Sequence, residues 1–541
     1  MTGLNIGNMG RVNKVLGMLL LIAISPYART QWNPDALKLA QVMDKVSRFY
    51  VDSINDDEIV ESTIEHMLHE LDPHSSYLSK EELEELSEQL EGEFEGIGVS
   101  FNILNDTIFI IRAIAGGPSE RVGIQAGDRI VQIEGETVAG TGITTRGVQE
   151  RLKGPKGTRV SMTVYRRGAG ELLDFQITRD KIPVYSVDAS YMVNEKIGYV
   201  RLSRFSHTSI EEFESAVKML KQEGMEDLIL DLSNNGGGWL PVAVELADHF
   251  LSGNKEIVRT EGDKVEEKIY RARKPGLFEE GNLVIMIDGS SASASEIVSG
   301  AIQDWDRGII VGRRSFGKGL VQQPFYLNDG SMIRLTVARY YTPTGRLIQK
   351  PYENGYEEYS HDLINRYNRG ELSSADSIEF PESQQYRTLT LNRTVYGGGG
   401  IMPDYFVPLD TTAYSDFYND LFRSGTLGQF AHRYLDDHRS EFVTKYPDIQ
   451  SYNANYHPGR DVLDQLVEAA SSDNHTEYDR DELEASMDRV ALLLKGYMAQ
   501  DLFGTSSFFE VMNPENDVFN KAVEILSNPV MQQQKLAKVE N

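Results

Sequence analysis

The sequence predicts a multidomain chain in which an α/β core and an α+β region are combined with helical segments. Residues 283–287 are a continuous apolar run of strand length, residues 228–232 are apolar except for Asp231, and each segment leads into a turn rich in glycine or serine. This pattern is typical of strands buried on both faces of a sheet. By contrast, residues 34–91 and the polar segment after 409 have helical patterns. With 541 residues and 40% hydrophobic content, the chain is long enough for three or four domains.

A short apolar run at residues 15–24 follows the basic residues Arg11 and Lys14. The run is too short to span a bilayer, and it predicts a secretory signal peptide over residues 1–28, cleaved after Ser25 or Ala28. The alternative is an uncleaved membrane anchor. Either interpretation places the rest of the chain outside the cytoplasm, and in the periplasm if the source is a Gram-negative bacterium.

Residues 32–91 are predicted to form a helical region, with a first amphipathic helix that opens at residues 36–43. The sequence Leu-Asp-Pro-His-Ser-Ser-Tyr-Leu at 71–78 breaks the helical pattern. An acidic helix with a solvated face is expected over residues 81–95.

The first apolar strand runs into Ser-Asn-Asn-Gly-Gly-Gly at 233–238. Three consecutive glycines free the backbone from side-chain sterics, so that their N–H groups can point at a ligand oxygen. Gly237 or Gly238 could therefore donate a hydrogen bond to an oxyanion. The alternative is an ordinary flexible turn between a strand and a helix.

The second strand leads into a serine-rich turn at 290–295 and then into a helix that ends near residue 305. A serine at a helix N-terminus lies beside free backbone N–H groups, which stabilise an oxyanion. Geometry alone does not choose among the serines at 290, 291, 293 and 295. Asp304 would lie roughly 16 Å from Ser293 along such a helix, so we expect it to be structural.

Lys318, flanked by Gly317 and Gly319, is the candidate base for such a serine. A serine hydroxyl is nearly inert unless a neighbouring group takes its proton, and lysine can do so only when it is neutral. Burial lowers a lysine pKa, and the apolar runs at 309–311 and 320–321 would bury this one. The alternative is a lysine in an exposed glycine turn.

Residues 197–350 resemble the C-terminal processing peptidases, also called tail-specific proteases, in several motifs that follow the family's order. These are Asp-Leu-Ser-Asn-Asn-Gly-Gly-Gly, Ser-Ala-Ser-Ala-Ser-Glu-Ile, Gly-Ala-Ile-Gln-Asp, Ser-Phe-Gly-Lys-Gly and Tyr-Tyr-Thr-Pro-Thr-Gly-Arg. The resemblance implies a crotonase-like α/β protease core over residues 182–408. It also implies that Ser293 is the nucleophile, Lys318 the base and Gln322 the residue that orients the lysine.

The same resemblance implies oxyanion donors at the N–H of Ala294 and of Gly237 or Gly238. This chain departs mildly from the family, which often has arginine and proline where Ser233 and Gly236 stand here. The departure leaves the choice between the two glycines open.

Residues 92–181 resemble a PDZ domain, a β-sandwich-like fold, through Gly-Ile-Gly-Val-Ser-Phe at 96–101 and glycine motifs near 116–130 and 152–158. The resemblance implies that a peptide C-terminus adds to a strand edge as an extra strand. The expected peptide-binding residues are Gly96, Ile97, Gly98 and Val99. By analogy, Lys153 lies in a loop that faces the protease and couples it to the PDZ domain. The alternative is a scaffold without a ligand.

An insertion at about 351–386, rich in Tyr, Glu, Ser and Asn, is expected to be a surface excursion. The family pattern resumes at Tyr-Gly-Gly-Gly-Gly-Ile-Met-Pro-Asp over 396–404. The resemblance covers roughly 34–408, so the helical segment 409–541 is predicted only as a C-terminal helical domain.

Composition excludes several classes of protein. The chain has no cysteine, which excludes disulfides, thiolate nucleophiles and thiolate zinc sites. A net charge of −28 argues against a nucleic-acid partner, because phosphate binding needs a basic surface. His207 and His249 are expected to be surface or packing residues. No metal or cofactor is expected.

These features together predict a secreted serine endopeptidase that captures exposed C-termini of proteins and cleaves through an acyl-enzyme. Its partners would be protein or peptide substrates, an adaptor protein and a second copy of the chain. One alternative is a catalytically silent PDZ scaffold that binds C-termini without cutting them. A chymotrypsin-like protease would instead show a Gly-Asn-Ser-Gly-Gly motif and a protease domain before the PDZ domain, and this chain shows neither.

Overall fold

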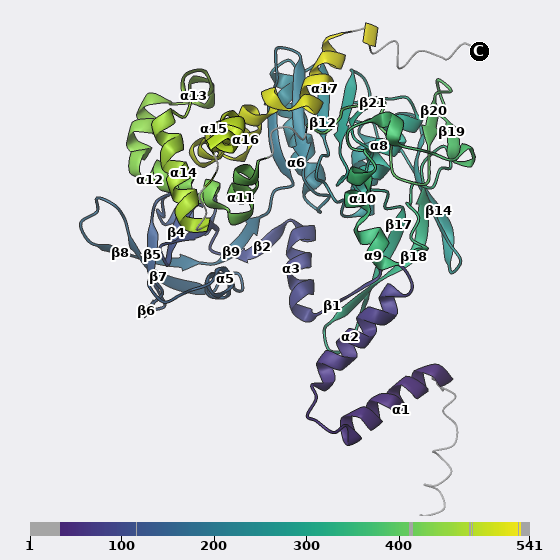
Figure 1. Ribbon diagram of the computed structural model, residues 1–541, viewed down its shortest axis with the longest axis horizontal. Coiled ribbons are helices and arrows are strands. Elements are labelled where there is room, and N and C mark those ends of the chain that lie inside the picture. The colour runs from purple at the N-terminus through teal and green to yellow at the C-terminus, as the bar shows by residue number, and fades with distance from the viewer. Residues whose placement is uncertain are drawn as a thin grey trace, which may run out of the picture. The chain divides into compact units, whose positions relative to one another are not determined.

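The computed structural model describes residues 33–114, 116–410, 415–474, 478, 480–528 and 530–531 (Figure 1). The predicted signal peptide, residues 1–28, lies outside them. The chain divides into two compact units, residues 1–66 and 67–541. No helix in the described ranges combines the length and the hydropathy that a membrane crossing requires.

The first unit contains α1 (Pro34–Phe49) and most of α2 (Asp56–His69). Asn33 caps α1 by accepting the N–H of Asp35, and Pro34 occupies the first helical position. The helical pattern expected from residue 36 is therefore present. Leu37, Leu39 and Val42 on α1 are exposed.

A six-stranded sheet forms the centre of the second unit, in the order β10–β11–β12–β15–β16–β21. Neighbours from β11 to β21 are parallel, and β10 joins antiparallel at one edge. The strands are β10 (Val187–Met192), β11 (Ile197–Leu202), β12 (Asp227–Asp231), β15 (Leu283–Ile287), β16 (Ile309–Gly312) and β21 (Tyr405–Phe406). The apolar runs predicted as strands at 228–232 and 283–287 are thus β12 and β15.

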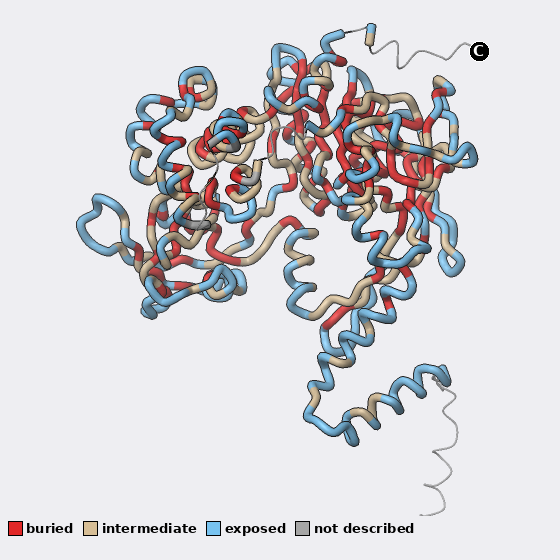
Figure 2. Tube along the Cα trace, viewed as in Figure 1, coloured by how far each residue is buried: buried red, intermediate tan, exposed pale blue. Residues whose placement is uncertain are grey.

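Both faces of this sheet are covered, as the continuous apolar runs predict. Leu228 and Leu230 pack into one hydrophobic cluster, whereas Ile229 between them packs into another. The first cluster includes α6 (Ser209–Gln222), α7 (Leu240–Asp248) and α8 (Ala294–Asp304), and the second includes α17 (Asp517–Ser527). Figure 2 shows the resulting concentration of buried residues along the sheet strands.

A second, antiparallel sheet carries the segment after Lys318. Its longest strand, β18 (Met332–Tyr341), pairs with three other strands along different parts of its length. These are β1 (Ser76–Leu78), β13 (Glu256–Gly262) and β17 (Leu320–Tyr326), and β13 also pairs with β14 (Val265–Arg271). Because β1 precedes the PDZ-like region, residues distant in sequence meet on β18.

Residues 93–183 form a separate layer around a small core. Its sheet has the order β3–β4–β5–β7–β8, with β3 (Val99–Leu104) at one edge and β6 beside β5. The other strands are β4 (Thr107–Ala113), β5 (Arg129–Ile133), β6 (Glu136–Thr137), β7 (Arg159–Tyr165) and β8 (Leu172–Thr178). Two helices, α4 (Pro118–Arg121) and α5 (Thr145–Leu152), accompany the sheet, and β2 (Glu93–Gly96) pairs with β9 (Asp180–Pro183).

The acidic helix before this region is shorter than predicted. It is α3 (Lys80–Glu91), and it stops because Gly92 adopts a left-handed conformation with φ 76°. Ser79 and Glu82 form a capping box at its N-terminus. The last residues of the predicted helix, 93–95, belong instead to β2.

The insertion at 351–386 is mostly exposed or half-buried, as expected of a surface excursion, but a few of its side chains are buried. Its helices α9 (Tyr356–Ser360) and α10 (Asp362–Asn368) bury Tyr359 and Arg366, which are 6% and 1% exposed. The Arg366 guanidinium donates to the backbone carbonyls of Arg314 and Ser315, in the loop that leads to Lys318. A composition rich in polar residues hid this role, because Arg366 is buried through hydrogen bonds to backbone carbonyls and not through an apolar surface. After the insertion, β19 (Gln385–Arg387) pairs with β20 (Thr394–Tyr396).

The C-terminal segment is helical, as predicted, and has a hydrophobic core of its own. That core joins residues of six helices, among them α15, which supplies residues along most of its length. The helices are α11 (Asp416–Ser424), α12 (Thr426–Lys445), α13 (Ile449–Asn455), α14 (Arg460–Asn474) and α15 (Arg480–Phe503), followed by α16 (Thr505–Met512).

Candidate active site

The serine-rich turn links β15 to α8 and places Ser293 immediately before the helix. Ser293 has φ 55°, a left-handed conformation that is uncommon for a residue with a side chain. The buried hydroxyls of Ser291 and Ser295 donate to the backbone carbonyls of Leu232 and Asn235. Ser293 is only partly buried. Ser291 and Ser295 therefore have structural roles, whereas Ser293 lies at the N-terminus of α8 with its side chain only partly covered.

The glycine turn after β12 lies directly against the serine turn. A Cβ built on Gly237 would stand 2.9 Å from the Ser293 Cβ and 3.0 Å from the Ala294 nitrogen, so only glycine fits this approach. Asn235, fully buried, accepts the N–H of Ala292 on its backbone carbonyl and so joins the two turns.

The two candidate glycine donors are not equivalent. The N–H of Gly237 donates to the side-chain oxygen of Asn235 at 2.9 Å. Neither Gly238 nor Ala294 has a backbone acceptor for its N–H among the described residues, and Gly238 is exposed. The arrangement therefore leaves the amides of Gly238 and Ala294 available to a ligand oxygen, while that of Gly237 is occupied.

Lys318 is partly buried and donates from Nζ to Gln322 Oε1 at 3.0 Å. Desolvation, the largest cause, and the cation Arg334 together lower the pKa of Lys318 to about 8, although Asp72 and Glu296 act in the opposite direction. Within the described chain, no hydrogen bond joins Lys318 Nζ to Ser293. The expectation of an exposed glycine-turn lysine does not describe this side chain.

A carboxylate that the sequence interpretation missed, Glu296, connects Ser293 to the lysine loop. Its side chain is fully buried, and Oε2 accepts the backbone N–H of Ser293 at 2.8 Å and of Lys318 at 2.9 Å. Its other oxygen accepts the N–H of Gly317 and the hydroxyl of Ser315. Burial raises the pKa of Glu296 to about 7, although these hydrogen bonds oppose the rise. A signal was present, because Ser-x-x-Glu at 293–296 is the pattern of a capping box.

Tyr340 on β18 reinforces the same connection. Its buried hydroxyl lies within hydrogen-bond distance of the backbone carbonyls of both Ser293 and Lys318. Desolvation raises the pKa of Tyr340 well above its ordinary value, so the hydroxyl keeps its proton. Glu296 and Tyr340 therefore each connect the backbone of the serine turn to the backbone of the lysine loop.

Gln322, the predicted orienting residue, is close to Lys318 in the structure. Its Oε1 accepts from Lys318 Nζ, and its Nε2 donates to the backbone carbonyl of His74. His74 belongs to the turn at 71–78, for which the sequence predicted a break in the helical pattern and no contact with Gln322. Its ring stays neutral, because burial and the nearby Lys318 lower the pKa of His74 to about 3.

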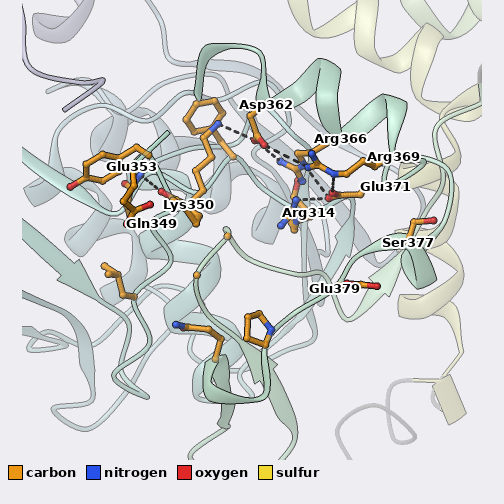
Figure 3. Close-up of a pocket in the computed structure, with 18 of the residues that line it drawn as sticks. Arg314, Gln349, Lys350, Glu353, Asp362, Arg366, Arg369, Glu371, Ser377 and Glu379 are labelled. Carbon is orange, nitrogen blue, oxygen red and sulfur yellow. Dashed lines mark hydrogen bonds and ion pairs between the residues drawn. The ribbon is translucent and has the colours of Figure 1, made fainter. Parts of the chain in front are cut away.

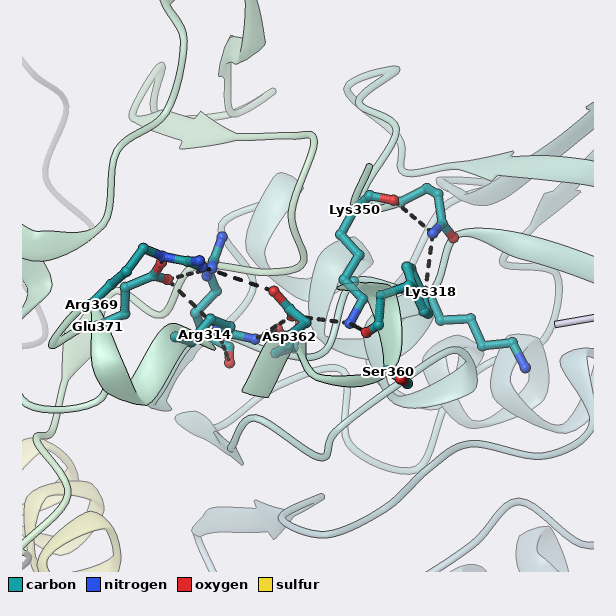
Figure 4. Close-up of polar contacts among 12 residues, drawn as sticks. Arg314, Lys318, Lys350, Ser360, Asp362, Arg369 and Glu371 are labelled. Atoms are coloured by element: carbon teal, nitrogen blue, oxygen red, sulfur yellow. Dashed lines mark hydrogen bonds and ion pairs between the residues drawn. The ribbon is translucent and has the colours of Figure 1, made fainter. Parts of the chain in front are cut away.

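A cavity of about 970 Å³ lies beside the lysine loop, between that loop and the insertion (Figure 3). Charged side chains line it and are paired with one another: Arg314 with Glu371, and Lys350 with Asp362 at 3.0 Å. Figure 4 shows this network, with the Lys318 side chain extending away from it. Lys350 also lies over the rings of Phe316 and Tyr359 at 3.9 and 4.0 Å from their centroids. The network therefore supports the loop from the side opposite the Lys318 side chain.

Asp304 and the two histidines have structural surroundings. Asp304 is fully buried and pairs with Arg346 at 2.7 Å, as expected of a structural residue. The ring of His249 packs near Phe213, and that of His207 near Trp239.

The predicted peptide-binding residues form the start of the PDZ-like sheet. Ile97 is buried in its core, and the carbonyls of Ile97 and Gly98 accept the N–H groups of Ser119 and Ile114. Val99 begins β3, whose outer edge has no strand partner in the described chain. Gly96 pairs with Asp180 across β2 and β9. An edge strand without a strand partner is what the predicted strand addition requires.

The coupling role expected of Lys153 stays a prediction. Lys153 pairs with Glu88 on α3 and lies 5.4 Å from the centroid of the Phe94 ring. In the described residues, no three His, Asp or Glu side chains gather as a metal site would require.

Three protein families match parts of this chain. Residues 196–355 match Peptidase family S41, and residues 109–166 match the PDZ domain. Residues 417–504, the C-terminal helices, match a family of unknown function, DUF8443. The three matched regions have separate hydrophobic cores.

Among curated proteins, the chain is 36% identical over 317 residues to the carboxy-terminal-processing protease of Bartonella bacilliformis. That match covers 58% of this chain and 72% of the relative. It is 33% identical over 319 residues to the carboxy-terminal processing protease CtpB of Bacillus subtilis, covering 58% of this chain and 65% of that protein.

Among solved structures, the photosystem II D1 C-terminal processing protease is 28% identical, with a TM-score of 0.32, and the match covers 58% of this chain and 89% of that one. The PDZ domain of a carboxy-terminal protease from Vibrio cholerae, solved in complex with a peptide, is 34% identical with a TM-score of 0.16. That match covers 17% of this chain and 97% of the domain.

Proposed function

This chain belongs to the carboxy-terminal-processing proteases of Peptidase family S41, and on that basis we propose that Ser293 is its nucleophile and Lys318 its general base. The chain is a serine peptidase with a PDZ domain that binds peptide substrates. The observation that carries the assignment of the two residues is Glu296, whose one carboxylate oxygen holds the backbones of both Ser293 and Lys318. A desolvated lysine in a loop that is tied to a serine at a helix N-terminus supports the assignment of a serine–lysine pair.

In the proposed reaction, neutral Lys318 takes the Ser293 proton as the serine oxygen attacks the peptide carbonyl. The resulting ammonium then donates a proton to the leaving amine, and the acyl-enzyme remains. Lys318, neutral again, activates the water that releases the second product. For each transfer Nζ must come within hydrogen-bond distance of the reacting oxygen or nitrogen.

The tetrahedral intermediate carries a negative oxygen that needs donors. We assign these to the backbone amides of Ala294 and Gly238, because both lack an acceptor in the described chain. Gly237 has a different role: its N–H is held by Asn235, and its missing side chain permits the close approach to Ser293. Two preorganised backbone amides stabilise an oxyanion strongly.

For substrate choice, we propose that the edge of β3 receives exposed protein C-termini, with Gly96, Ile97, Gly98 and Val99 forming the binding segment. Strand addition uses unpaired backbone groups together with a terminal carboxylate, and both occur together only at a chain end. The proposed substrates are extracytoplasmic proteins, in the periplasm for a Gram-negative source, because residues 15–24 resemble a signal sequence. An adaptor protein and self-association are further proposed partners.

The core architecture is proposed to be crotonase-like. Two features support this proposal. The central sheet is mostly parallel and has helices on both faces, and residues of β13 and β18 in the second sheet pack into the hydrophobic cluster on one of those faces.

The test uses an unstructured peptide with a free C-terminus and the same peptide amidated at its C-terminus. The native protein is expected to cleave the free peptide and to cleave the amidated one about tenfold more slowly at low substrate concentration. Ser293→Ala is expected to bind the free peptide with unchanged affinity and to cut neither. Cleavage by purified Ser293→Ala would overturn the nucleophile assignment. Binding without cleavage by the native protein would instead favour the silent scaffold.

A further inference from the structure

The turn formed by residues 72–75 lies against Gln322, although nearly 250 residues separate them in the sequence. Gln322 Nε2 donates to the backbone carbonyl of His74, and Oε1 of the same amide accepts from Lys318. A carbonyl can only accept a hydrogen bond, so it selects the amide orientation that turns the oxygen towards the lysine. The orientation of Gln322 is therefore set from outside the strand that carries it.

Asp72 holds this turn in shape. Its side chain is buried, at 7% exposure, and one oxygen accepts the N–H of His74 at 2.8 Å and of Ser75 at 2.9 Å. The other oxygen accepts the Ser75 hydroxyl at 2.6 Å. Three hydrogen bonds to a single carboxylate define the position of the His74 carbonyl, because they constrain the backbone on both sides of it.

Asp72 and Ser75 also bind the turn to the residue that lies opposite Gln322 in the neighbouring strand. Thr336 on β18 is the register partner of Gln322 on β17. The Thr336 hydroxyl donates to Asp72 Oδ1 at 3.0 Å, and the Thr336 N–H donates to the Ser75 hydroxyl at 3.1 Å. Hydrogen bonds therefore connect the turn both to the Gln322 side chain and to the strand that pairs with β17.

We propose that Asp72 is a positioning residue for peptide cleavage: by holding the His74 carbonyl, it orients the Gln322 amide and through it the Lys318 side chain. This inference rests on the proposed serine–lysine function. A neutral lysine amine has two N–H groups and one lone pair. Directing one N–H at Gln322 restricts the directions that remain for the lone pair, which must meet the Ser293 proton. Asp72 touches neither substrate nor reacting atoms.

The test is a double-mutant cycle between Asp72→Ala and Gln322→Ala, measured as kcat on the unstructured peptide. If Asp72 acts through Gln322, Asp72→Ala lowers kcat about tenfold in the native background, with KM unchanged, and less than about twofold in the Gln322→Ala background. The rate at which a fluorophosphonate probe labels Ser293 provides a second, more sensitive readout in the same four proteins. An equal effect of Asp72→Ala in both backgrounds would overturn the proposal.

Two further variants separate positioning from folding. Asp72→Asn keeps an oxygen acceptor for the turn and is expected to recover kcat to within about threefold of native. Thr336→Val removes only the hydroxyl that meets Asp72, and it replaces Asp72→Ala in the cycle if the latter does not fold. A folded Asp72→Ala protein with native kcat would refute the role.

Asp329 supplies the matched control. It caps the turn at the other end of the same hairpin, where Oδ1 accepts the N–H and the hydroxyl of Ser331. Asp329→Ala is expected to leave kcat unchanged, and a loss equal to that of Asp72→Ala would contradict the proposal. Activity retained by Ser293→Ala would refute the proposed function instead, so the two failures are distinguishable.

Discussion

The carboxylate of Glu296 accepts the backbone N–H of Lys318 at 2.9 Å, although the two residues lie on opposite sides of β16 in the sequence. The same oxygen accepts the N–H of Ser293. One buried side chain therefore sets the separation between the backbones of the proposed nucleophile and the proposed base.

Replacing Glu296 by glutamine tests this connection. The amide offers one acceptor oxygen and one donor nitrogen, so at least two of the four donors around it lose their acceptor. We expect the free energy of unfolding to fall by about 2–3 kcal/mol and kcat by about 100-fold. Thermal unfolding and peptide turnover measure the two effects.

The exposed capping box of α3 provides the control, because Glu82 accepts the N–H of Ser79 at 2.9 Å in the same helix position. Glu82→Gln is expected to cost under about 1 kcal/mol and to leave turnover unchanged. If Glu296→Gln and Glu82→Gln change the free energy of unfolding and the turnover by equal amounts, Glu296 acts only as a helix cap.

The pH dependence of kcat/KM follows from the pKa of Lys318, which burial lowers to about 8. Only the neutral amine can accept the serine proton, so activity is expected to fall about tenfold per pH unit below 8 and to level off above it. A profile that levels off near pH 6 would point to a different base. His74 is not that base, since burial and Lys318 lower its pKa to about 3.

Lys318→Met is expected to stabilise the fold near neutral pH. The folded-state pKa of about 8 lies below the ordinary value of 10.5, so the unfolded chain binds more protons between these values. The native protein is therefore destabilised below pH 8 and recovers as pH rises towards 10.5. We expect a gain of about 1–3 kcal/mol at pH 7, part of it offset by the lost partner of Gln322, and a shrinking gain above pH 8. Denaturant unfolding at pH 7 and pH 10 measures both values.

Gly237→Ala is expected to separate the glycine turn from Ser293. The added methyl would stand 2.9 Å from the Ser293 Cβ, and φ of 105° is itself unfavourable for alanine. Turnover should fall about 100-fold while peptide binding to the PDZ domain is unchanged. Gly253→Ala, at φ 73° with open space around it, controls for backbone strain alone and should keep native turnover.

Local sequence pattern was sufficient for much of the site. Strands β12 and β15 followed from continuous apolar runs, and the serine turn and α8 followed from small residues before a helical segment. The burial of Lys318 was also foreseeable, because apolar strands flank its loop. Each of these features depends on neighbours within a few residues.

Features that depend on distant partners were missed. Nothing near Gln322 in the sequence indicates that its amide meets the His74 carbonyl, and the polar composition around Arg366 gave no sign of its burial. The choice between Gly237 and Gly238 needed the side chain of Asn235, since only its contact shows which amide is occupied. Tertiary structure decides such questions, not local propensity.

The pairing of β1 with β18 limits which fragments of the chain can keep the site intact. A fragment trimmed to the region that matches Peptidase family S41, residues 196–355, would lack the segment around residue 74 and leave the Gln322 amide without its acceptor. The proposed active site therefore combines two segments of the chain that are separated in sequence by the whole PDZ-like region. Grafting the peptidase region alone into another protein would transfer Ser293 and Lys318, the proposed nucleophile and base, without the turn that holds the Gln322 amide.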